Sequence, residues 1–448
     1  MRSIKNHIFR ALALVCGLFA VSCQSDLPEI KDYADSDHLL KVFALSYGNY
    51  QYYAAIDHDT RSMSLSNIVY SELVTDVKYT LAEGATISPI PGEDPWCESQ
   101  TYTISLDGEA VDYTLNLPDY SEFVDYKSVG YITAAYYDYA NKIDHIDWSN
   151  LSHVIMSFLQ VNADGSIQYS SDMLISRLND LLATAALNDF KVMIAVQSSS
   201  TSSKNFYQAI NNETSRASLI ESLVNFVDDY ELAGIDIDYE EYYNIGTAFD
   251  TFLRELGEAL DVLEEQRGYK VEYSAAVAPN ISGYPSDLGS IVDFINLMIY
   301  DIGWSSLNAD HASVSYFQST LAGGMAKYGA DARQLIGGLP FYGYTYDSLG
   351  ASSSASGSAG TQKAYNEIFT TYISKYSASD IAFSNQIENT VYDGRLKIAE
   401  KCQYVVDNTY GGIMIWQIGQ DLTNTYEDYK LLPVIGETIP YIEGKEIQ

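Results

Sequence analysis

The chain has 448 residues, of which 47% are hydrophobic and 19% are charged. This is the composition of a globular protein, and it excludes both an intrinsically disordered chain and a bundle of membrane-spanning helices. The 25 basic and 60 acidic residues give a formal net charge of −35, which repels phosphate backbones and anionic lipid headgroups. We therefore expect no nucleic-acid partner, whereas a neutral polymer is compatible with this charge.

Cysteine and histidine are sparse and irregularly spaced. The four cysteines are too few for a disulfide scaffold, and Cys97 and Cys402 are so far apart in the sequence that we expect both to be unpaired. The six histidines are His7, His38, His58, His145, His153 and His311. No two of them have the spacing of metal ligands, so we expect surface or hydrogen-bonded core positions and neither a metal ion nor a cofactor.

Residues 1–22 have the pattern of a signal peptide. Arg2, Lys5 and Arg10 form a positively charged region at the N-terminus. Residues 11–21 then form an apolar run that is too short to span a bilayer stably. The pattern predicts export of the protein.

The end of this signal peptide resembles the lipobox of bacterial lipoproteins, with the sequence Ala-Val-Ser-Cys at residues 20–23. The resemblance implies cleavage before Cys23, lipidation of its thiol, and a place on the outer membrane or cell surface. The alternative is an ordinary signal peptide that is followed by an unmodified cysteine. Residues 24–37 are polar and acidic, and we expect residues 23–37 to form a tether.

Residues 38–118 are predicted to form a small β domain. Residues 102–106 and 111–117 alternate apolar with polar side chains, and Asp107 and Gly108 between them are a strong hairpin signal. Further short alternating runs and frequent turn residues predict an antiparallel sandwich of immunoglobulin-like type. The pattern resembles the small β modules that precede the catalytic domains of secreted bacterial glycan enzymes.

The function of this β domain has two interpretations. One is carbohydrate binding through Trp96 or a cluster of tyrosines, because aromatic rings suit the faces of sugars. The cluster consists of Tyr47, Tyr50, Tyr52 and Tyr53. The other interpretation, which we favour, is a spacer that holds the next domain away from the membrane.

From residue 126 onward, short apolar runs alternate with segments of helical period. The runs are VGYITAAYY, HVIMSFLQV, KVMIAV, AGIDIDYE, VEYSAAVA, FINLMIYD, QLIGGLPFYG and GGIMIW. Eight such runs predict an α/β fold, a (β/α)8 TIM barrel over residues 126–448. The alternative, a doubly wound sheet, requires a Gly-rich phosphate loop after the first strand, which the sequence lacks. The low-complexity segment 350–360 is expected to be a loop on the active face.

The fourth run carries the residues that point to chemistry. It reads AGIDIDYE over residues 233–240, and because side chains alternate along a strand, Asp236, Asp238 and Glu240 are predicted to face the barrel interior. Neighbouring carboxylates repel one another and lose solvation, so some of them hold protons at neutral pH. A protonated carboxylic acid at the C-terminal end of a barrel strand is suited to general acid catalysis. A bound cation or a solvated acidic rim is the alternative explanation.

This run resembles the signature D-G-x-D-x-D-x-E of family 18 glycoside hydrolases, the chitinases and endo-β-N-acetylglucosaminidases, with Ala233 in place of the first Asp. Other segments between residues 126 and 430 resemble the same family in barrel order. They are VGYITAAYY, HVIMSF, MIYD, GGLPFYGY and GGIMIW. Matching segments in this order make the resemblance specific.

The resemblance implies a retaining hydrolase of β-1,4 bonds in glycans that contain N-acetylglucosamine, and we expect it to be a monomer. It implies that Glu240 is the acid and base, while the nucleophile is the 2-acetamido oxygen of the substrate itself. It also implies that Asp238 orients the acetamido group, that Asp236 shares a proton with Asp238, and that Tyr300 hydrogen-bonds the acetamido oxygen. The implied substrate-binding residues are Trp416, Asp301, Met298, Tyr131 and Trp304.

Two positions depart from the family pattern. Ala195 stands where the family has a serine near Asp236, so that aspartate is expected to lack a partner, and Ala233 removes a carboxylate. A family 18-like lectin with weak or no catalysis therefore stays open as an alternative. The sequence between the seventh and eighth runs shows no long insertion that would deepen the cleft, which predicts a shallow, open site. The substrate is either a chitin-like oligosaccharide or the chitobiose core of N-glycans.

Overall fold

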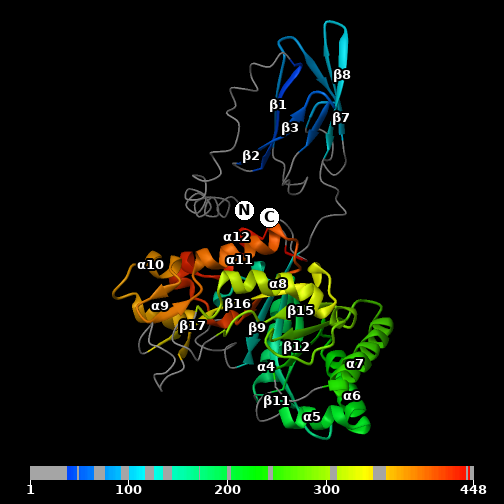
Figure 1. Ribbon diagram of the computed structural model, residues 1–448, viewed down its shortest axis with the longest axis vertical. Helices are drawn as coiled ribbons and strands as arrows, with labels where there is room; N and C mark the ends of the chain where they lie inside the picture. Colours follow the sequence, from blue (N-terminus) through cyan, green and yellow to red (C-terminus); the bar gives the residue numbers. More distant parts are fainter. Residues whose placement is uncertain are drawn as a thin grey trace. The chain divides into compact units, whose positions relative to one another are not determined.

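The computed structural model describes residues 38–47, 50–64, 76–91, 100–116, 126–134, 144–170, 172–198, 203–240, 246–302, 310–346, 360–439 and 442–443 (Figure 1). The chain divides into two compact units, residues 1–124 with 447–448, and residues 125–446. The predicted signal peptide, Cys23 and the tether lie outside the described residues, as do Trp96, Cys97 and Trp304. So do nearly all of the low-complexity segment and the side chains of the tyrosine cluster.

The first unit is a β structure, as the alternating runs predict. One sheet has the order β2 (Tyr50–Tyr53), β1 (Leu40–Tyr47) and β5 (Asp76–Leu81). The other has the order β3 (Ala55–Asp57), β4 (Ser62–Ser64), β8 (Glu109–Asn116), β7 (Gln100–Leu106) and β6 (Thr86–Ser88). The predicted hairpin turn is present, with positive φ at Asp107 (52°) and Gly108 (88°).

The two sheets of this unit share one hydrophobic core. Leu40 and Phe43 of β1 pack in the same buried cluster as Tyr102 of β7 and Leu115 of β8, so the sheets form a sandwich. The pairing is not antiparallel throughout, because β4 runs parallel to β8.

The second unit is a closed barrel of eight parallel strands, which confirms the predicted fold. In order these are β9 (Lys127–Thr133), β10 (His153–Val161), β12 (Lys191–Ser198), β13 (Gly234–Tyr239), β14 (Glu272–Val277), β15 (Phe294–Leu297), β16 (Leu335–Pro340) and β21 (Gly412–Trp416). Closure follows because β9 pairs with both β10 and β21. A short strand, β11 (Ile167–Tyr169), extends β10 in antiparallel pairing.

Helices lie between most of the barrel strands (Figure 1). They are α4 (Leu174–Asn188), α5 (Ser203–Asn211), α6 (Glu213–Asp229), α7 (Gly246–Arg267), α8 (Val314–Tyr328) and α11 (Arg395–Asp407), with α12 (Leu432–Thr438) after the last strand. The large apolar residues of α7 that the helical period places on one face are buried, namely Phe249, Phe252, Leu253, Leu256, Leu260 and Leu263. Among the described helices, none combines the length and hydropathy needed to cross a membrane.

The segment between β16 and β21 differs from the prediction. It folds as a four-stranded antiparallel sheet in the order β18 (Thr361–Ala364), β17 (Tyr342–Thr345), β20 (Thr390–Tyr392) and β19 (Gln386–Ile387), with α9 (Tyr365–Tyr372) and α10 (Ala378–Phe383). The expectation of no insertion was therefore wrong. Strands of two to four residues are too short to show a clear alternating pattern in the sequence.

A cluster of charged residues lies at the N-terminal ends of the barrel strands. Glu272 Oε1 lies 2.6 Å from Lys191 Nζ, and Glu272 Oε2 lies 2.6 Å from His153 Nε2. Glu443 also pairs with Lys191 at 2.6 Å and with Lys127. His153, Glu272 and Glu443 are close enough to hold a metal ion, but the two lysine ammonium groups already pair with these carboxylates.

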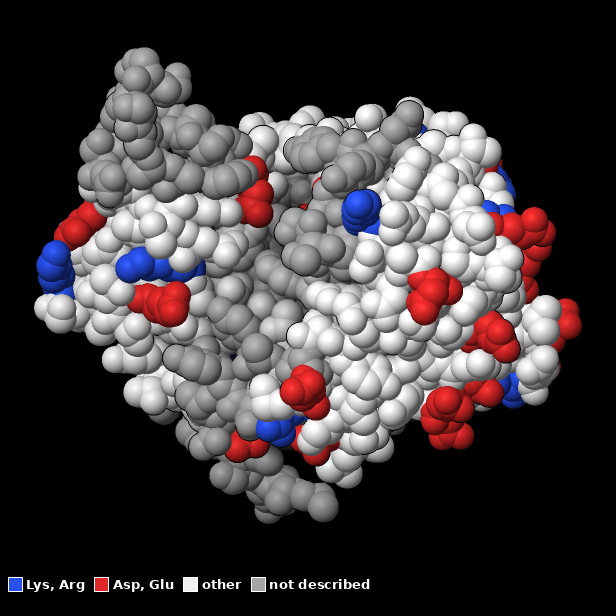
Figure 2. All heavy atoms as spheres, turned by 90° about the horizontal axis from the view of Figure 1, so that it is seen from below, with Lys and Arg blue, Asp and Glu red and all other residues white. Residues whose placement is uncertain are grey.

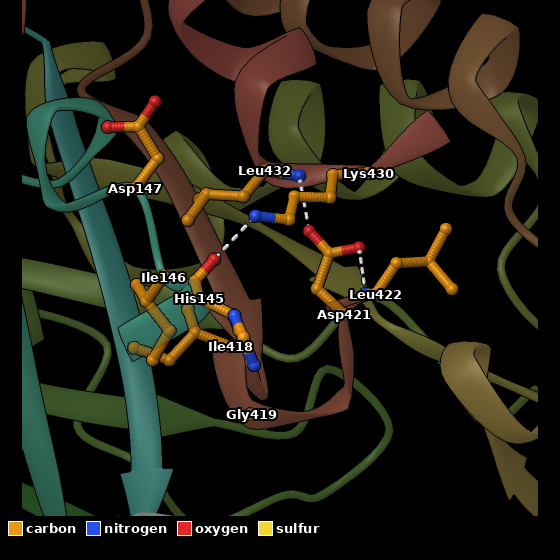
Figure 3. A pocket seen from close by; sticks show the side chains of 9 residues that line it. All are labelled: His145, Ile146, Asp147, Ile418, Gly419, Asp421, Leu422, Lys430 and Leu432. Atoms are coloured by element: carbon orange, nitrogen blue, oxygen red, sulfur yellow. Dashed lines mark hydrogen bonds between the residues drawn. The ribbon is translucent and has the colours of Figure 1, made fainter. Parts of the chain in front are cut away.

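The C-terminal helix is fixed to the barrel by a second buried polar group (Figure 3). Asp421 accepts hydrogen bonds from the backbone N–H groups of Leu431 and Leu432 at the start of α12. Lys430 Nζ donates to the carbonyl oxygen of His145 at 2.6 Å, joining this end of the chain to the β9–β10 connection. In this small pocket, Asp421 and Lys430 therefore hold the C-terminal segment against the barrel.

Candidate active site

The three acidic residues of β13 lie as the alternating pattern predicts. Asp236 and Asp238 are buried in the barrel interior, with 0% and 4% exposure, and Glu240 is exposed just beyond the end of the strand. Tyr239 points to the opposite side, where its ring packs against Phe206 of α5 and Phe249 of α7. The strand therefore separates a polar interior row from an apolar row that faces the helices.

Asp236 is held by hydrogen bonds from three other strands of the barrel, β14, β15 and β9. Its Oδ1 accepts from Ser274 Oγ at 2.6 Å and from Asn296 Nδ2 at 3.3 Å, and its Oδ2 accepts from Tyr131 OH at 2.8 Å. Burial raises the pKa of Asp236 to about 6, although these three donors favour the charged form. The expectation that Ala195 leaves this aspartate without a partner was therefore wrong, because Ser274 on the other side of β13 supplies the hydroxyl.

Asp238 is the most strongly perturbed member of the row. Burial raises its pKa well above the usual value, and the charges of Glu240 and Asp236 raise it further, whereas a hydrogen bond from Gln197 acts in the opposite direction. Its Oδ1 is buried and has no hydrogen-bond partner within the described part of the chain. Asp238 therefore holds a proton to higher pH than an ordinary aspartate does, and it can exchange that proton with its neighbours on either side.

These acids open into a hollow of about 510 Å³ at the C-terminal end of the barrel. The lining residues are Tyr131, Asp238, Glu240, Ala276, Met298, Tyr300, Asp301, Tyr342, Gln362, Met414 and Trp416. The structure thus brings together seven of the residues that the sequence singled out, while Asp236 lies beneath them and Trp304 is outside the described residues. Tyr342 and Gln362 come from the insertion, which forms one wall of the hollow.

Aromatic rings form the apolar side of this hollow. The indole of Trp416 stacks near the ring of Phe158, with centroids 5.7 Å apart, and lies 5.8 Å from the ring of Tyr131. Tyr300 OH contacts Met414 Sδ at 3.8 Å, and burial together with the charge of Glu240 holds the pKa of Tyr300 well above its usual value. Tyr300 therefore keeps its hydroxyl proton and remains a hydrogen-bond donor.

Asp301 lies at the rim of the same hollow in an uncommon backbone conformation, with φ of 63°. Its Oδ1 accepts hydrogen bonds from Tyr342 OH at 2.7 Å and from Tyr344 OH at 2.9 Å. Both tyrosines belong to β17, so the insertion sheet also orients a carboxylate of the barrel.

The second departure from the family pattern lies just before β13, at the opposite end of the strand from Glu240. Ala233 lines an apolar hollow with Phe190 and Glu272 at the N-terminal end of β13. It is three residues from Asp236, roughly 10 Å along an extended strand, and seven residues from Glu240, so it does not contact the carboxylate of Glu240. Gly234 next to it lets β13 and β14 approach, since a Cβ there would lie 2.0 Å from the carbonyl oxygen of Glu272.

Sequence reasoning missed several residues that shape the site, among them Ser274, Asn296 and Gln362. Ser274 and Asn296 sit inside the fifth and sixth apolar runs, where a polar residue facing the interior of a barrel is the signal that would have revealed them. Gln362 follows the low-complexity segment, and nothing in the local sequence marks it.

The profile of glycosyl hydrolases family 18 matches residues 127–421, which is the barrel with its insertion. The chain belongs to glycoside hydrolase family 18. This match covers the acid row, the aromatic hollow and the insertion sheet, and it makes the protein a glycosidase.

Individual relatives of this family 18 hydrolase are chitinases by name. A solved chitinase from Bacteroides thetaiotaomicron is 29% identical, with a TM-score of 0.59 over 72% of this chain and 99% of its own. Endochitinase 1 from Metarhizium anisopliae is 25% identical over 65% of this chain and 82% of its own length. Chitinase A1 from Niallia circulans is 25% identical over 60% and 46%, respectively.

Proposed function

We propose that this family 18 hydrolase cleaves β-1,4 bonds between N-acetylglucosamine residues with retention of configuration, using a nucleophile supplied by the substrate. The observation that carries the proposal is the row Asp236, Asp238 and Glu240, in which an exposed acid stands beside a buried one whose pKa is raised by burial. No cation among the described residues lines the hollow, so the acids are not neutralised there.

The first step requires an acid at the glycosidic oxygen. Glu240 donates its proton to the leaving oxygen, while the carbonyl oxygen of the substrate's 2-acetamido group attacks the anomeric carbon and forms an oxazolinium ion. Asp238 passes its proton to Asp236, and the resulting carboxylate accepts a hydrogen bond from the acetamido N–H and stabilises the developing positive charge. Glu240 then takes a proton from water, which opens the oxazolinium ion on the face that the leaving group left.

The remaining lining residues orient the sugar. Tyr300 keeps its proton, so its hydroxyl donates a hydrogen bond to the acetamido oxygen and makes that oxygen's approach to the anomeric carbon more direct. Trp416 offers an apolar face against the sugar ring, and Asp301 accepts from the substrate at the rim of the hollow.

A chitin-type chain is the substrate that the site supports best. The relatives named above are chitinases, and the wall formed by the insertion suits an extended chain of sugars better than a single branched core. A neutral polymer also suits the charge, since the face in Figure 2 shows scattered acidic side chains and few basic ones. The test is incubation with chito-oligosaccharides and with a high-mannose glycoprotein, followed by mass measurement; release of only the N-glycan would contradict the chitin assignment.

A lectin without catalysis is no longer favoured by any observation. Its support was the absence of a serine at Ala195 and of a carboxylate at Ala233. Asp236 accepts hydrogen bonds from Ser274, Asn296 and Tyr131, and Ala233 lies at the opposite end of β13 from Glu240.

We further propose that the enzyme is exported and anchored by a lipid at Cys23, because a charged and apolar leader ends there in a lipobox-like sequence. The Cys23→Ala variant is expected to be released from the membrane into the medium or periplasm. If that variant stays membrane-bound after high-salt and carbonate washes, the lipid anchor is wrong.

A further inference from the structure

Asp301 is supported from behind by a buried histidine. His311 Nδ1 lies 3.5 Å from Asp301 Oδ1 and accepts a hydrogen bond from the backbone N–H of Asp301 at 3.4 Å. The imidazole is completely buried, while Asp301 itself reaches the hollow. One side of Asp301 therefore faces the substrate in the hollow, and His311 contacts the opposite side of Asp301.

The same imidazole packs against the two tyrosines that bind this carboxylate. Its ring centroid lies 5.4 Å from that of Tyr342 and 5.0 Å, edge to face, from that of Tyr344. A backbone N–H can only donate, so Nδ1 accepts and the ring proton belongs on Nε2. His311 thus fixes both the backbone of Asp301 and the rings whose hydroxyl groups hold its Oδ1.

A buried ion cluster lies behind His311. Asp393 pairs through Oδ1 with Lys397 at 2.7 Å and through Oδ2 with Lys401 at 2.5 Å, and all three side chains are at most 3% exposed. Lys397 pairs in addition with Asp310, the residue before His311. Buried ion pairs are weak sources of stability because desolvation offsets their attraction, so a role in holding geometry is the more economical explanation.

We propose that His311 is a positioning residue for Asp301, and that the cluster of Asp393, Lys397 and Lys401 fixes the segment that carries it. By holding the backbone of Asp301 at positive φ, His311 directs the carboxylate so that Oδ1 is held by the two tyrosines and Oδ2 is left for the substrate. His311 does not touch the substrate. The inference rests on the proposed function, because it assigns Asp301 the task of binding the sugar.

The test is a double-mutant cycle with His311→Leu and Asp301→Asn. His311→Leu is expected to lower kcat/KM on chitotetraose by roughly ten- to a hundred-fold, mainly by raising KM, because the carboxylate loses its orientation. In the Asp301→Asn background the same change is expected to have little further effect. The cycle is repeated as the affinity of the catalytically blocked Glu240→Gln protein for chitotetraose.

Matched variants separate positioning from simple packing. Asn has nearly the size of Leu but keeps an acceptor near the position of Nδ1, so His311→Asn is expected to restore most of the lost activity. Tyr342→Phe and Tyr344→Phe are each expected to lose several-fold in kcat/KM, since each removes a donor to Asp301. Tyr346→Phe is the control, because the hydroxyl of Tyr346 has no hydrogen-bond partner within the described residues.

Additive effects of the two substitutions, or a folded His311→Leu enzyme with unchanged KM, would overturn the inference. If His311→Leu does not fold, the cycle of His311→Gln with Asp301→Asn decides in its place, because Gln keeps a polar side chain in the buried position but moves the acceptor away from the backbone N–H of Asp301. An inactive wild-type enzyme would count against the proposed function, and the binding cycle in the Glu240→Gln protein would then still decide the role of His311.

Discussion

Both ends of the barrel bury carboxylates, but the pKa values of these carboxylates shift in opposite directions at the two ends. At the C-terminal end, burial raises the pKa of Asp236 to about 6 and the pKa of Asp238 also lies well above its usual value. At the N-terminal end, burial acts on Glu272 in the same direction, but a hydrogen bond from His153 and the charges of Lys127 and Lys191 outweigh it. The pKa of Glu272 is therefore held well below its usual value.

The difference shows that burial alone does not decide whether an acid keeps its proton. At the N-terminal end of the barrel, the paired lysines keep the acids charged, so this cluster has a structural role. At the C-terminal end, the described lining residues include no cation, so the pKa values of the acids stay raised. A raised pKa lets a carboxylic acid keep the proton that general acid catalysis requires. Burial also lowers the pKa of His153, so its contribution to the cluster at the N-terminal end is chiefly that of a hydrogen-bonding neutral ring.

The largest effect is expected from removing Glu240, the exposed acid at the C-terminal end of the barrel. Glu240→Gln is expected to lower kcat by about 10²–10⁴-fold or more, because the leaving oxygen loses its proton donor. Rates are measured on chito-oligosaccharides, and the thermal unfolding temperature is expected to stay the same because Glu240 is exposed.

Two further substrates check the assigned mechanism. Sugars with activated leaving groups need no acid to depart, so they are expected to recover part of the activity of Glu240→Gln. A glucoside that lacks the acetamido group is expected not to be cleaved by the wild type, and its efficient hydrolysis would contradict substrate-assisted catalysis. A full-rate Glu240→Gln enzyme would show that the site itself is wrong.

The second prediction is that the two ends contribute to stability with opposite pH dependence. The folded state binds a proton at Asp236 more tightly than the unfolded state does, so its contribution to the free energy of unfolding falls by about 3 kcal/mol as the pH rises from about 4 to 6. Glu272 does the reverse, because its stabilisation is present above its unfolded value of 4.5 and is lost as the pH falls.

Denaturant unfolding across pH 3 to 8 measures these contributions as differences from the wild type. In Asp236→Asn the fall between about pH 4 and 6 is expected to be smaller. In Glu272→Gln the protein is expected to be less stable at neutral pH, with the difference from wild type shrinking in acid. If the difference in the free energy of unfolding from wild type changed in the same direction with pH for both variants, the comparison would be wrong.

A third, smaller effect is expected from the residue that replaces the missing family serine. Ser274→Ala removes one hydrogen bond to the buried carboxylate of Asp236, which is expected to lower kcat roughly ten-fold and to shift the acidic limb of the pH–rate profile upward. Ser157→Ala is the control, because the hydroxyl of Ser157 is buried but has no hydrogen-bond partner in the described part of the chain. Equal effects of both substitutions would argue for packing alone.

The smallest effect is expected from removing the β domain. A protein that begins at Asp125 contains the whole second unit, so it is expected to fold and to keep its kcat/KM on short soluble oligosaccharides. Circular dichroism and the same kinetic assay measure this. Loss of turnover with the fold intact would mean that the β domain takes part in the site.

Much of this molecule follows from local patterns. The eight apolar runs predict the eight barrel strands, because a parallel strand that is buried on both faces needs a short continuous apolar segment. Alternation along residues 234–240 places Asp236, Asp238 and Glu240 on one side without any knowledge of the fold. The Asp107-Gly108 turn is equally local, because only its backbone conformation is at stake.

The hydrogen-bond partners of these residues depend on the tertiary structure. Ser274 and Asn296 reach Asp236 from separate strands, and sequence reasoning that followed the family serine instead concluded that the aspartate lacked a partner. The insertion sheet and the contact of His311 with Asp301 join residues whose separation in the chain carries no periodic signal. Periodicity sets the direction of a side chain along its own strand, whereas pKa values and hydrogen bonds depend on which other strands lie beside it, and only closure of the barrel determines that.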